Sequence, residues 1–151
     1  MRSLLVLILA TMPLLAAEKP NLTGAWKMNA EKSDWGKLPK PAGFLRNITH
    51  KDPNLTVATV FNTDKGDITT EFKYTTDGKE SVNNVRGAEV RSTVKWDGDA
   101  VAIESHRPAQ GGDFMTKERW VLVDGGKAMV VMSKSTSPQT DFTVTMYLEK
   151  Q

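Results

Sequence analysis

The side chains that could carry out acid–base, nucleophilic or metal chemistry are few in this chain. It has no cysteine and only two histidines, His50 and His106. Each histidine stands beside a basic residue, and neither has the partner spacing of a zinc site. The chain contains no Gly-x-Ser-x-Gly, no glycine-rich phosphate loop and no His-Glu-x-x-His. We therefore predict no catalytic residue, no metal ligand and no cofactor, and an enzyme is the least favoured of the open functions.

Aromatic and aliphatic side chains offer a different chemistry, the binding of an apolar or amphipathic small molecule. Cavities for such ligands are lined mainly by apolar and aromatic groups with a few polar ones. The predicted ligand-binding residues stand in segments of alternating pattern, and they are Phe72, Tyr74, Val94, Trp96, Phe142, Val144 and Tyr147. The open alternative is an interior filled by these side chains, in a protein that acts through its surface as an envelope interaction module or inhibitor.

The elements that must position these residues are short strands. Ten runs rich in Val and Thr alternate between apolar and polar residues or are continuously apolar, and most are closed by Gly, Asn, Asp or Pro turns. Residues 80–85 form the weakest of them, because Asn83 and Asn84 disfavour a pleated surface. The ten predicted strands are residues 22–28, 44–50, 55–62, 68–75, 80–85, 89–96, 100–106, 113–123, 128–135 and 141–149.

Their regular spacing predicts an all-β fold, an antiparallel up-and-down meander. An open sheet of ten strands would leave two exposed edges and an uncovered apolar face. Closure into a small barrel of about eight to ten strands removes both problems. A sandwich remains open, because a period of two residues does not distinguish the two architectures.

One connection between predicted strands is longer than the others. Residues 29–43 separate the first two strands and contain Trp35 and Leu38 among two prolines and two glycines. Long loops in compact domains often serve as lids or pack as Ω-loops. We expect Trp35 and Leu38 either to plug one end of the barrel, which is the favoured interpretation, or to act as a lid.

The first 17 residues have the pattern of a secretory signal peptide. A basic start is followed by a short apolar run and by Ala16-Ala17. Cleavage would leave residues 18–151 as one barrel domain, exported to the periplasm or secreted. That part has 19 basic and 18 acidic residues, which argues against a nucleic-acid partner. The apolar run at the start is too short to span a membrane comfortably, and no second long apolar run follows it. The oligomeric state is not predicted.

The first strand carries a family pattern. Leu22-Thr23-Gly24-Ala25-Trp26-Lys27, soon after a signal peptide, resembles the calycins, which are the lipocalins and fatty-acid-binding proteins. The segment from Asn21 to Gly36 also resembles exported bacterial lipocalin-like proteins of unassigned function. The resemblance implies that Gly24 and Trp26 form the closed end of the barrel, with Arg119 as the arginine that often lies against this tryptophan.

The second half of the chain resembles the fatty-acid-binding branch. The resemblance rests on Val90 through Asp97-Gly98, on Lys117-Glu118-Arg119 and on the final Met146-Tyr147-Leu148. Members of that branch often hold a ligand carboxylate with interior arginines and an Arg-x-Tyr on the last strand. Tyr147 matches the tyrosine, but Thr145 stands where the arginine would be, and Arg119 matches the other arginine only loosely.

Overall fold

Ten antiparallel strands make up most of the computed structural model, which describes residues 17–151. All ten predicted strands are present. The one short 3-10 helix, η1, spans Asp124–Gly126 between β8 and β9. The predicted signal peptide lies outside the described residues except for Ala17. The strands are β1 (Gly24–Met28), β2 (Gly43–Lys51), β3 (Asn54–Thr63), β4 (Gly66–Thr75), β5 (Asp77–Val85), β6 (Ala88–Asp97), β7 (Ala100–Ala109), β8 (Gly112–Val123), β9 (Ala128–Thr136) and β10 (Asp141–Lys150).

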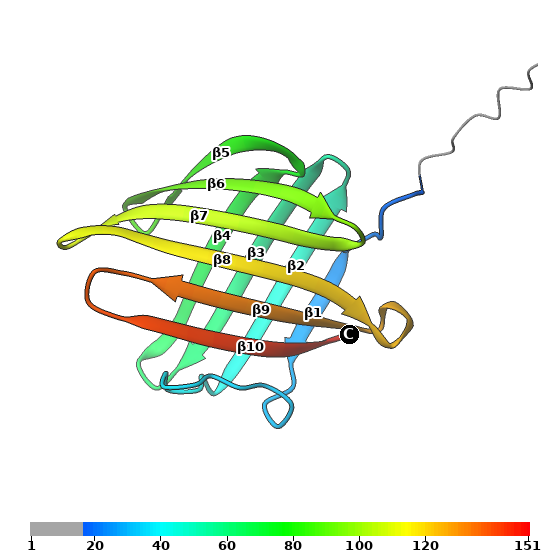
Figure 1. Ribbon diagram of the computed structural model, residues 1–151. Helices are drawn as coiled ribbons and strands as arrows, with labels where there is room; N and C mark the ends of the chain where they lie inside the picture. The colour runs from blue at the N-terminus through cyan, green and yellow to red at the C-terminus, as the bar shows by residue number, and fades with distance from the viewer. Residues whose placement is uncertain (1–16) are drawn as a thin grey trace, which may run out of the picture.

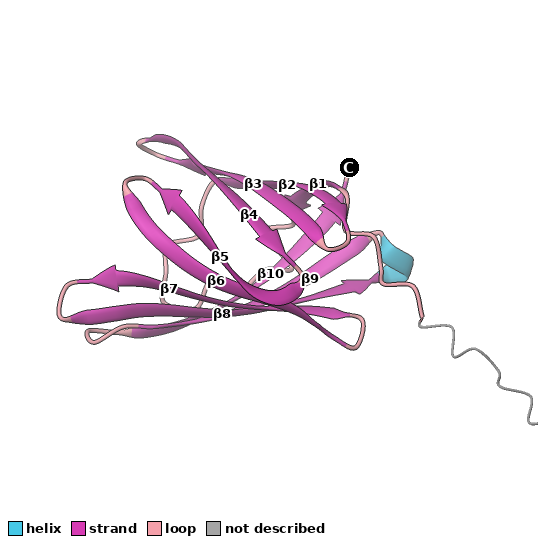
Figure 2. Cartoon of the chain, turned by 90° about the horizontal axis from the view of Figure 1, so that it is seen from above, coloured by secondary structure: helices cyan, strands magenta, loops and turns pink. Residues whose placement is uncertain are grey.

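The strands form a meander that curls into a nearly closed barrel. Neighbours in sequence pair with one another except for β4 and β5, and β1 also pairs with β10, so the sheet runs in the order β4-β3-β2-β1-β10-β9-β8-β7-β6-β5. Figure 1 shows β1–β4 passing behind β5–β10, and Figure 2 shows the same arrangement from above. The predicted meander and barrel are confirmed, and the sandwich is excluded.

The barrel has one seam, between β4 and β5, where the described strands share no backbone ladder. Side chains replace it. The amide of Asn83 accepts from the backbone N–H of Lys73 at 2.8 Å and donates to the carbonyl of Lys73 at 3.0 Å, and the hydroxyl of Ser81 accepts from the N–H of Thr75 at 3.3 Å. Asn83, which made residues 80–85 the weakest predicted strand, is therefore the residue that links β5 to β4.

One end of the barrel is filled by apolar side chains. Trp26 is fully buried, and its indole N–H donates to the carbonyl of Leu22 at 2.9 Å. The other almost completely buried apolar residues are Leu22, Leu55, Val94, Val101, Met129, Val131 and Leu148. This closed end is the principal core of the protein.

Gly24 and Trp26 lie at the closed end as the resemblance implied, but Arg119 does not. The side chain of Arg119 points outward and pairs with the carboxylate of Asp97. The cation against Trp26 is Lys150, with its ammonium 5.3 Å from the ring centre, because Lys150 is opposite Trp26 in the β1–β10 ladder. Gly24 has a φ of +153°, and a Cβ there would meet the Lys150 side chain at 2.7 Å, so glycine makes room for this lysine.

The connection between β1 and β2 is attached to the edge of β10. Asp34 and Thr145 exchange two backbone hydrogen bonds of 2.8 Å, and the hydroxyl of Ser33 accepts from the N–H of Tyr147 at 2.9 Å. Trp35 and Leu38 are partly buried against the core. The connection is thus fixed to the barrel wall, with Trp35 and Leu38 packed against the core.

Candidate ligand-binding cavity

The barrel is not filled throughout. A cavity of about 540 Å³ lies between the closed core and the turns at the other end, and it falls within the usual range for small-molecule sites. A cavity-free barrel, the alternative considered for the sequence, is therefore not what this chain forms. The cavity is lined by Arg46, Val57, Thr59, Phe61, Thr70, Phe72, Tyr74, Val85, Arg86, Ala88, Val90, Ile103, Ser105, His106, Arg107, Phe114, Thr116, Glu118 and Trp120.

Two of the seven predicted ligand-binding residues line this cavity. Phe72 and Tyr74 project inward from β4, and their rings stack with centres 5.4 Å apart. Burial raises the pKa of the Tyr74 phenol well above its usual range, and the negative charge of Glu118 adds to the effect. Tyr74 therefore presents a neutral hydroxyl to the cavity over the whole physiological pH range.

Four of the predicted ligand-binding residues face the barrel interior but lie outside the cavity, either nearer the closed end or on another part of the wall. Val94 is fully buried in the closed core, and Val144 is also buried there. Trp96 lies at the same end, where its indole N–H donates to Asp52, and Phe142 packs beside Phe114 with ring centres 6.0 Å apart. None of the four lines the cavity, because alternation predicts the face of a strand but not the distance from the barrel's end.

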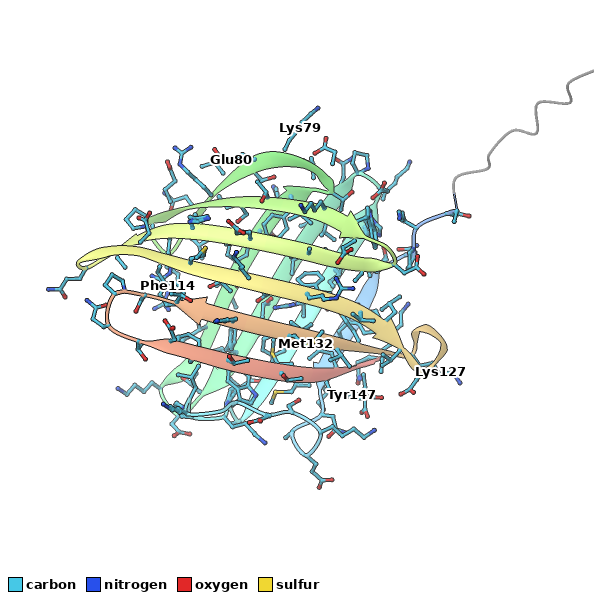
Figure 3. All side chains as sticks on the ribbon, in the orientation of Figure 1. Lys79, Glu80, Phe114, Lys127, Met132 and Tyr147 are labelled. Carbon is cyan, nitrogen blue, oxygen red and sulfur yellow. The ribbon has the colours of Figure 1, made fainter. Side chains whose placement is uncertain are left out.

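Tyr147, the seventh predicted ligand-binding residue, is on the outer face of β10 and does not line the cavity. Its hydroxyl donates to the carboxylate of Asp124, and the ammonium of Lys32 lies 4.5 Å from its ring centre. Burial alternates along β10, and Met146 and Leu148 on either side of Tyr147 point into the core. Figure 3 labels Tyr147 beside β10.

The charged pair inside the barrel is the feature that sequence reasoning missed. Arg46 projects inward from β2, and Glu118 and Trp120 project from β8 on the opposite side of the lumen. The guanidinium carbon of Arg46 is 4.6 Å from the Trp120 ring centre, and Trp120 donates its indole N–H to Glu118 at 2.7 Å. One signal was available, since Arg46 alternates with the apolar Phe44 and Ile48 and so shares their inward face.

Hydroxyl groups complete the polar part of the wall. Ser105 and Thr116 line the cavity, and their hydroxyls are hydrogen-bonded to those of Ser92 at 2.8 Å and Ser135 at 3.1 Å behind them. Away from the mouth, the rest of the wall is mainly apolar. This mixture of a mainly apolar wall with a small cluster of polar groups is typical of sites for amphipathic molecules.

The mouth of the cavity is basic and aromatic. Arg86 in the β5–β6 turn and Arg107 near the end of β7 line it and are exposed. The guanidinium of Arg107 lies 4.2 Å from the ring centre of Phe114, which is labelled in Figure 3 near the β7–β8 turn. A ligand that enters therefore passes two cations before it reaches the interior.

The part of the chain that the structure describes contains neither a metal-binding cluster nor a membrane-spanning helix. Among residues 17–151, no three His, Asp or Glu side chains converge in a way that could hold a metal ion. Over the same residues, no helix has the length and apolar character needed to cross a bilayer.

The closed end is tied together by one carboxylate. Asp52, in the β2–β3 turn, accepts from the hydroxyl of Thr76 at 2.5 Å, from the indole of Trp96 at 2.9 Å and from the ring of His50 at 3.3 Å. These groups, with the hydroxyl of Thr76 contributing most, hold the pKa of Asp52 below its usual value. The carboxylate of Asp52 thus links Thr76 between β4 and β5, Trp96 in β6 and His50 in β2.

We expect Asp52→Asn to lower the free energy of unfolding at pH 7 by about 1 kcal/mol, because a neutral acceptor replaces a charged one at a half-exposed position. The pKa of Asp52 is lowered by folding, so its contribution is present above about pH 4 and disappears as the pH falls through the folded-state pKa. Urea unfolding at pH 7 and at pH 3 measures this. A difference that persists undiminished at the lower pH would contradict the charge-based explanation.

Taken together, the closed meander and its lined interior define a calycin-type barrel, the class that the Gly24-x-Trp26 resemblance predicted. No protein-family model and no curated protein matches the chain. Solved structures do match, and they show the fold. A secretory abundant heat soluble protein from Ramazzottius varieornatus is 11% identical, with a TM-score of 0.65, and the alignment covers 88% of this chain and 98% of that one.

Two further neighbours share the same fold. The zebrafish ileal bile acid-binding protein, solved with cholic acid, is 13% identical with a TM-score of 0.56, and the alignment covers 86% of this chain and 98% of that one. Human cRBP IV is 15% identical with a TM-score of 0.56, covering 87% and 99%.

Proposed function

We propose that this protein is an exported binding protein that holds an apolar or amphipathic small molecule inside its barrel. The observation that carries the proposal is the cavity of about 540 Å³, whose walls are mainly apolar and include a buried arginine–glutamate pair, a few hydroxyls and the basic residues of the mouth. The zebrafish neighbour is described as a bile acid-binding protein in complex with cholic acid, so the same fold holds an amphipathic ligand there.

The apolar wall would supply most of the binding free energy. Val57, Phe61, Phe72, Val90 and Ile103 come from four strands on both sides of the lumen. Each square ångström of apolar surface removed from water contributes about 25 cal/mol, before the entropy of association is subtracted. The polar groups would instead orient the ligand and select its head group.

Native mass spectrometry of the protein purified from its own host tests the proposal. We expect a bound organic species that leaves on denaturation, and displacement of an uncharged fluorescent dye, Nile red, when that species is added back. If no bound species is found and Nile red does not bind at micromolar protein, these results would contradict a small-molecule carrier.

Export rests on the signal-peptide pattern and is tested separately. We expect the protein recovered outside the cytoplasm to begin at Glu18, which the intact mass would show. Recovery of the full-length chain in the cytoplasm would contradict export without affecting the binding proposal.

A further inference from the structure

The arginine–glutamate pair inside the barrel joins the two sides of the cavity. Arg46 Nη1 and Glu118 Oε2 are 3.8 Å apart, and their side chains are 8% and 20% exposed. Arg46 also stacks near the rings of Trp120 and Phe44, at 4.6 and 5.2 Å. The guanidinium is thus held in place by aromatic neighbours rather than by hydrogen bonds.

The donors of Arg46 are not used within the protein. Its Nε and Nη1 are buried and have no hydrogen-bond partner among the described residues. The distance to Glu118 exceeds that of a hydrogen bond, and the same glutamate oxygen already accepts from the indole of Trp120. Buried polar groups are almost always satisfied, and the Arg46 side chain lines the cavity, so a ligand oxygen there can be the acceptor that the described residues do not supply.

A single oxygen atom can complete this pair. An oxygen at an ordinary hydrogen-bond distance of about 2.7–2.9 Å from both Nη1 and Oε2 forms a triangle whose third side is the observed 3.8 Å. To satisfy both ends, that oxygen must accept from the guanidinium and donate to the carboxylate. A hydroxyl does both, whereas an ionised carboxylate only accepts.

Charge leads to the same choice. Arg46 and Glu118 together are neutral, so a ligand anion placed between them would gain one attraction and meet one repulsion, and would also lose its hydration. The other titratable groups that line the cavity are Tyr74, which is neutral, and Arg86, His106 and Arg107. Both of these arginines are exposed at the mouth, where solvent screens them. They therefore act on an entering ligand more than on a head group bound at the pair.

We propose that Arg46 and Glu118 bind the hydroxyl group of an apolar alcohol, in preference to the carboxylate of the same skeleton. The hydroxyl oxygen accepts from Arg46 and its proton is donated to Glu118. The hydrocarbon lies along Val57, Phe72 and Ile103 toward Phe61 and Phe114 at the mouth. The inference rests on the proposed function and specifies the ligand class for the same cavity.

The test compares dodecan-1-ol with dodecanoate, which share a chain and differ in the head group. Binding to the purified protein is followed by tryptophan fluorescence, because Trp120 lines the cavity. The alcohol is the more hydrophobic ligand and gains affinity from that alone, so the decisive quantity is the ratio of the two affinities in wild type and variants.

Glu118→Gln is the decisive variant. It keeps the shape of the side chain and an acceptor for Trp120, but it leaves the charge of Arg46 uncompensated. We expect the alcohol-to-carboxylate affinity ratio to fall by about tenfold or more, through tighter dodecanoate binding. Glu104→Gln is the matched control, because Glu104 is on the outer face of β7, paired with Lys117 at 3.3 Å, and its loss should leave the ratio unchanged.

The outcomes separate the two proposals. Dodecanoate binding more tightly than dodecan-1-ol to the wild type, or a ratio that Glu118→Gln leaves unchanged, would overturn the alcohol inference while a small-molecule carrier stands. Failure of both ligands and of Nile red to bind the wild type would overturn the carrier and the inference together.

Discussion

Replacing Trp26 by alanine should lower the free energy of unfolding by about 3–5 kcal/mol, the largest stability loss that we expect from a single substitution in this protein. Trp26 has no exposed surface, and it fills the closed end of a barrel that no disulfide supports. Alanine would leave a void among Leu22, Met129 and Leu148, which are as buried as the tryptophan itself. It would also remove the 2.9 Å hydrogen bond from the indole to Leu22.

Chemical denaturation followed by circular dichroism measures the effect, and Trp35→Ala serves as its control. Trp35 lies in the connection between β1 and β2 and is only partly buried. Its indole N–H contacts the sulfur of Met28 at 3.3 Å. We expect its removal to lower the free energy of unfolding by less than half as much. Equal losses at the two positions would show that the closed end is not the principal core.

The fold could be predicted from local patterns because each strand carries its own turn signal. Asp97 ends β6 and Asp77-Gly78 begins β5 directly after the turn at Thr76, and Gly78 and Gly98 both adopt a positive φ. The long connection between β1 and β2 was predicted because its prolines and glycines interrupt the strand pattern. The pairing of β1 with β10 was inferred only from the need to remove sheet edges, since no local pattern encodes a contact between the two ends of a chain.

The seam illustrates what local propensity misses. Asn83 disfavours a strand by its intrinsic preference, yet β5 forms through it, because β6 supplies a ladder on one side and the Asn83 amide bonds to Lys73 on the other. Tertiary partners decide such positions, and they are invisible to a propensity scale.

The candidate site was only partly predictable, for two physical reasons. Alternation correctly placed Phe72 and Tyr74 inside, but it could not distinguish the filled end from the open one, so Val94 and Val144 were included. Tyr147 was included through the family resemblance, although the alternation of its own strand placed it opposite Met146. The alternation in this chain's own sequence thus predicted the inward face of β10 better than the family pattern did.

The polar pair was missed because burying a charge is costly and therefore unexpected. An arginine within an apolar pattern is expected to pack its stem along the strand and to keep its charged end in water. Arg46 instead crosses the lumen, and Glu118 meets it from β8, which lies 72 residues further along the chain. A pairing over that distance follows only from the closed barrel.

Filling the cavity by mutation should abolish ligand binding without unfolding the protein. Thr70 lines the cavity from β4, and its neighbour Thr69 is exposed on the outer face of the same strand. We expect Thr70→Trp to weaken Nile red binding by about tenfold or more, because the indole would occupy space that the ligand needs. Tryptophan is well tolerated in strands, so the free energy of unfolding should change by no more than about 1 kcal/mol.

Thr69→Trp is the matched control for this experiment, since it introduces the same side chain one residue away and toward solvent. Its Nile red affinity should equal that of the wild type, because alternate residues of a strand face opposite sides of the sheet. A surface site would give a different result, with binding lost in Thr69→Trp or kept in both variants, and it would place the ligand outside the barrel. Loss of binding in Thr70→Trp alone, in a protein that is still folded, requires the ligand to lie inside the barrel.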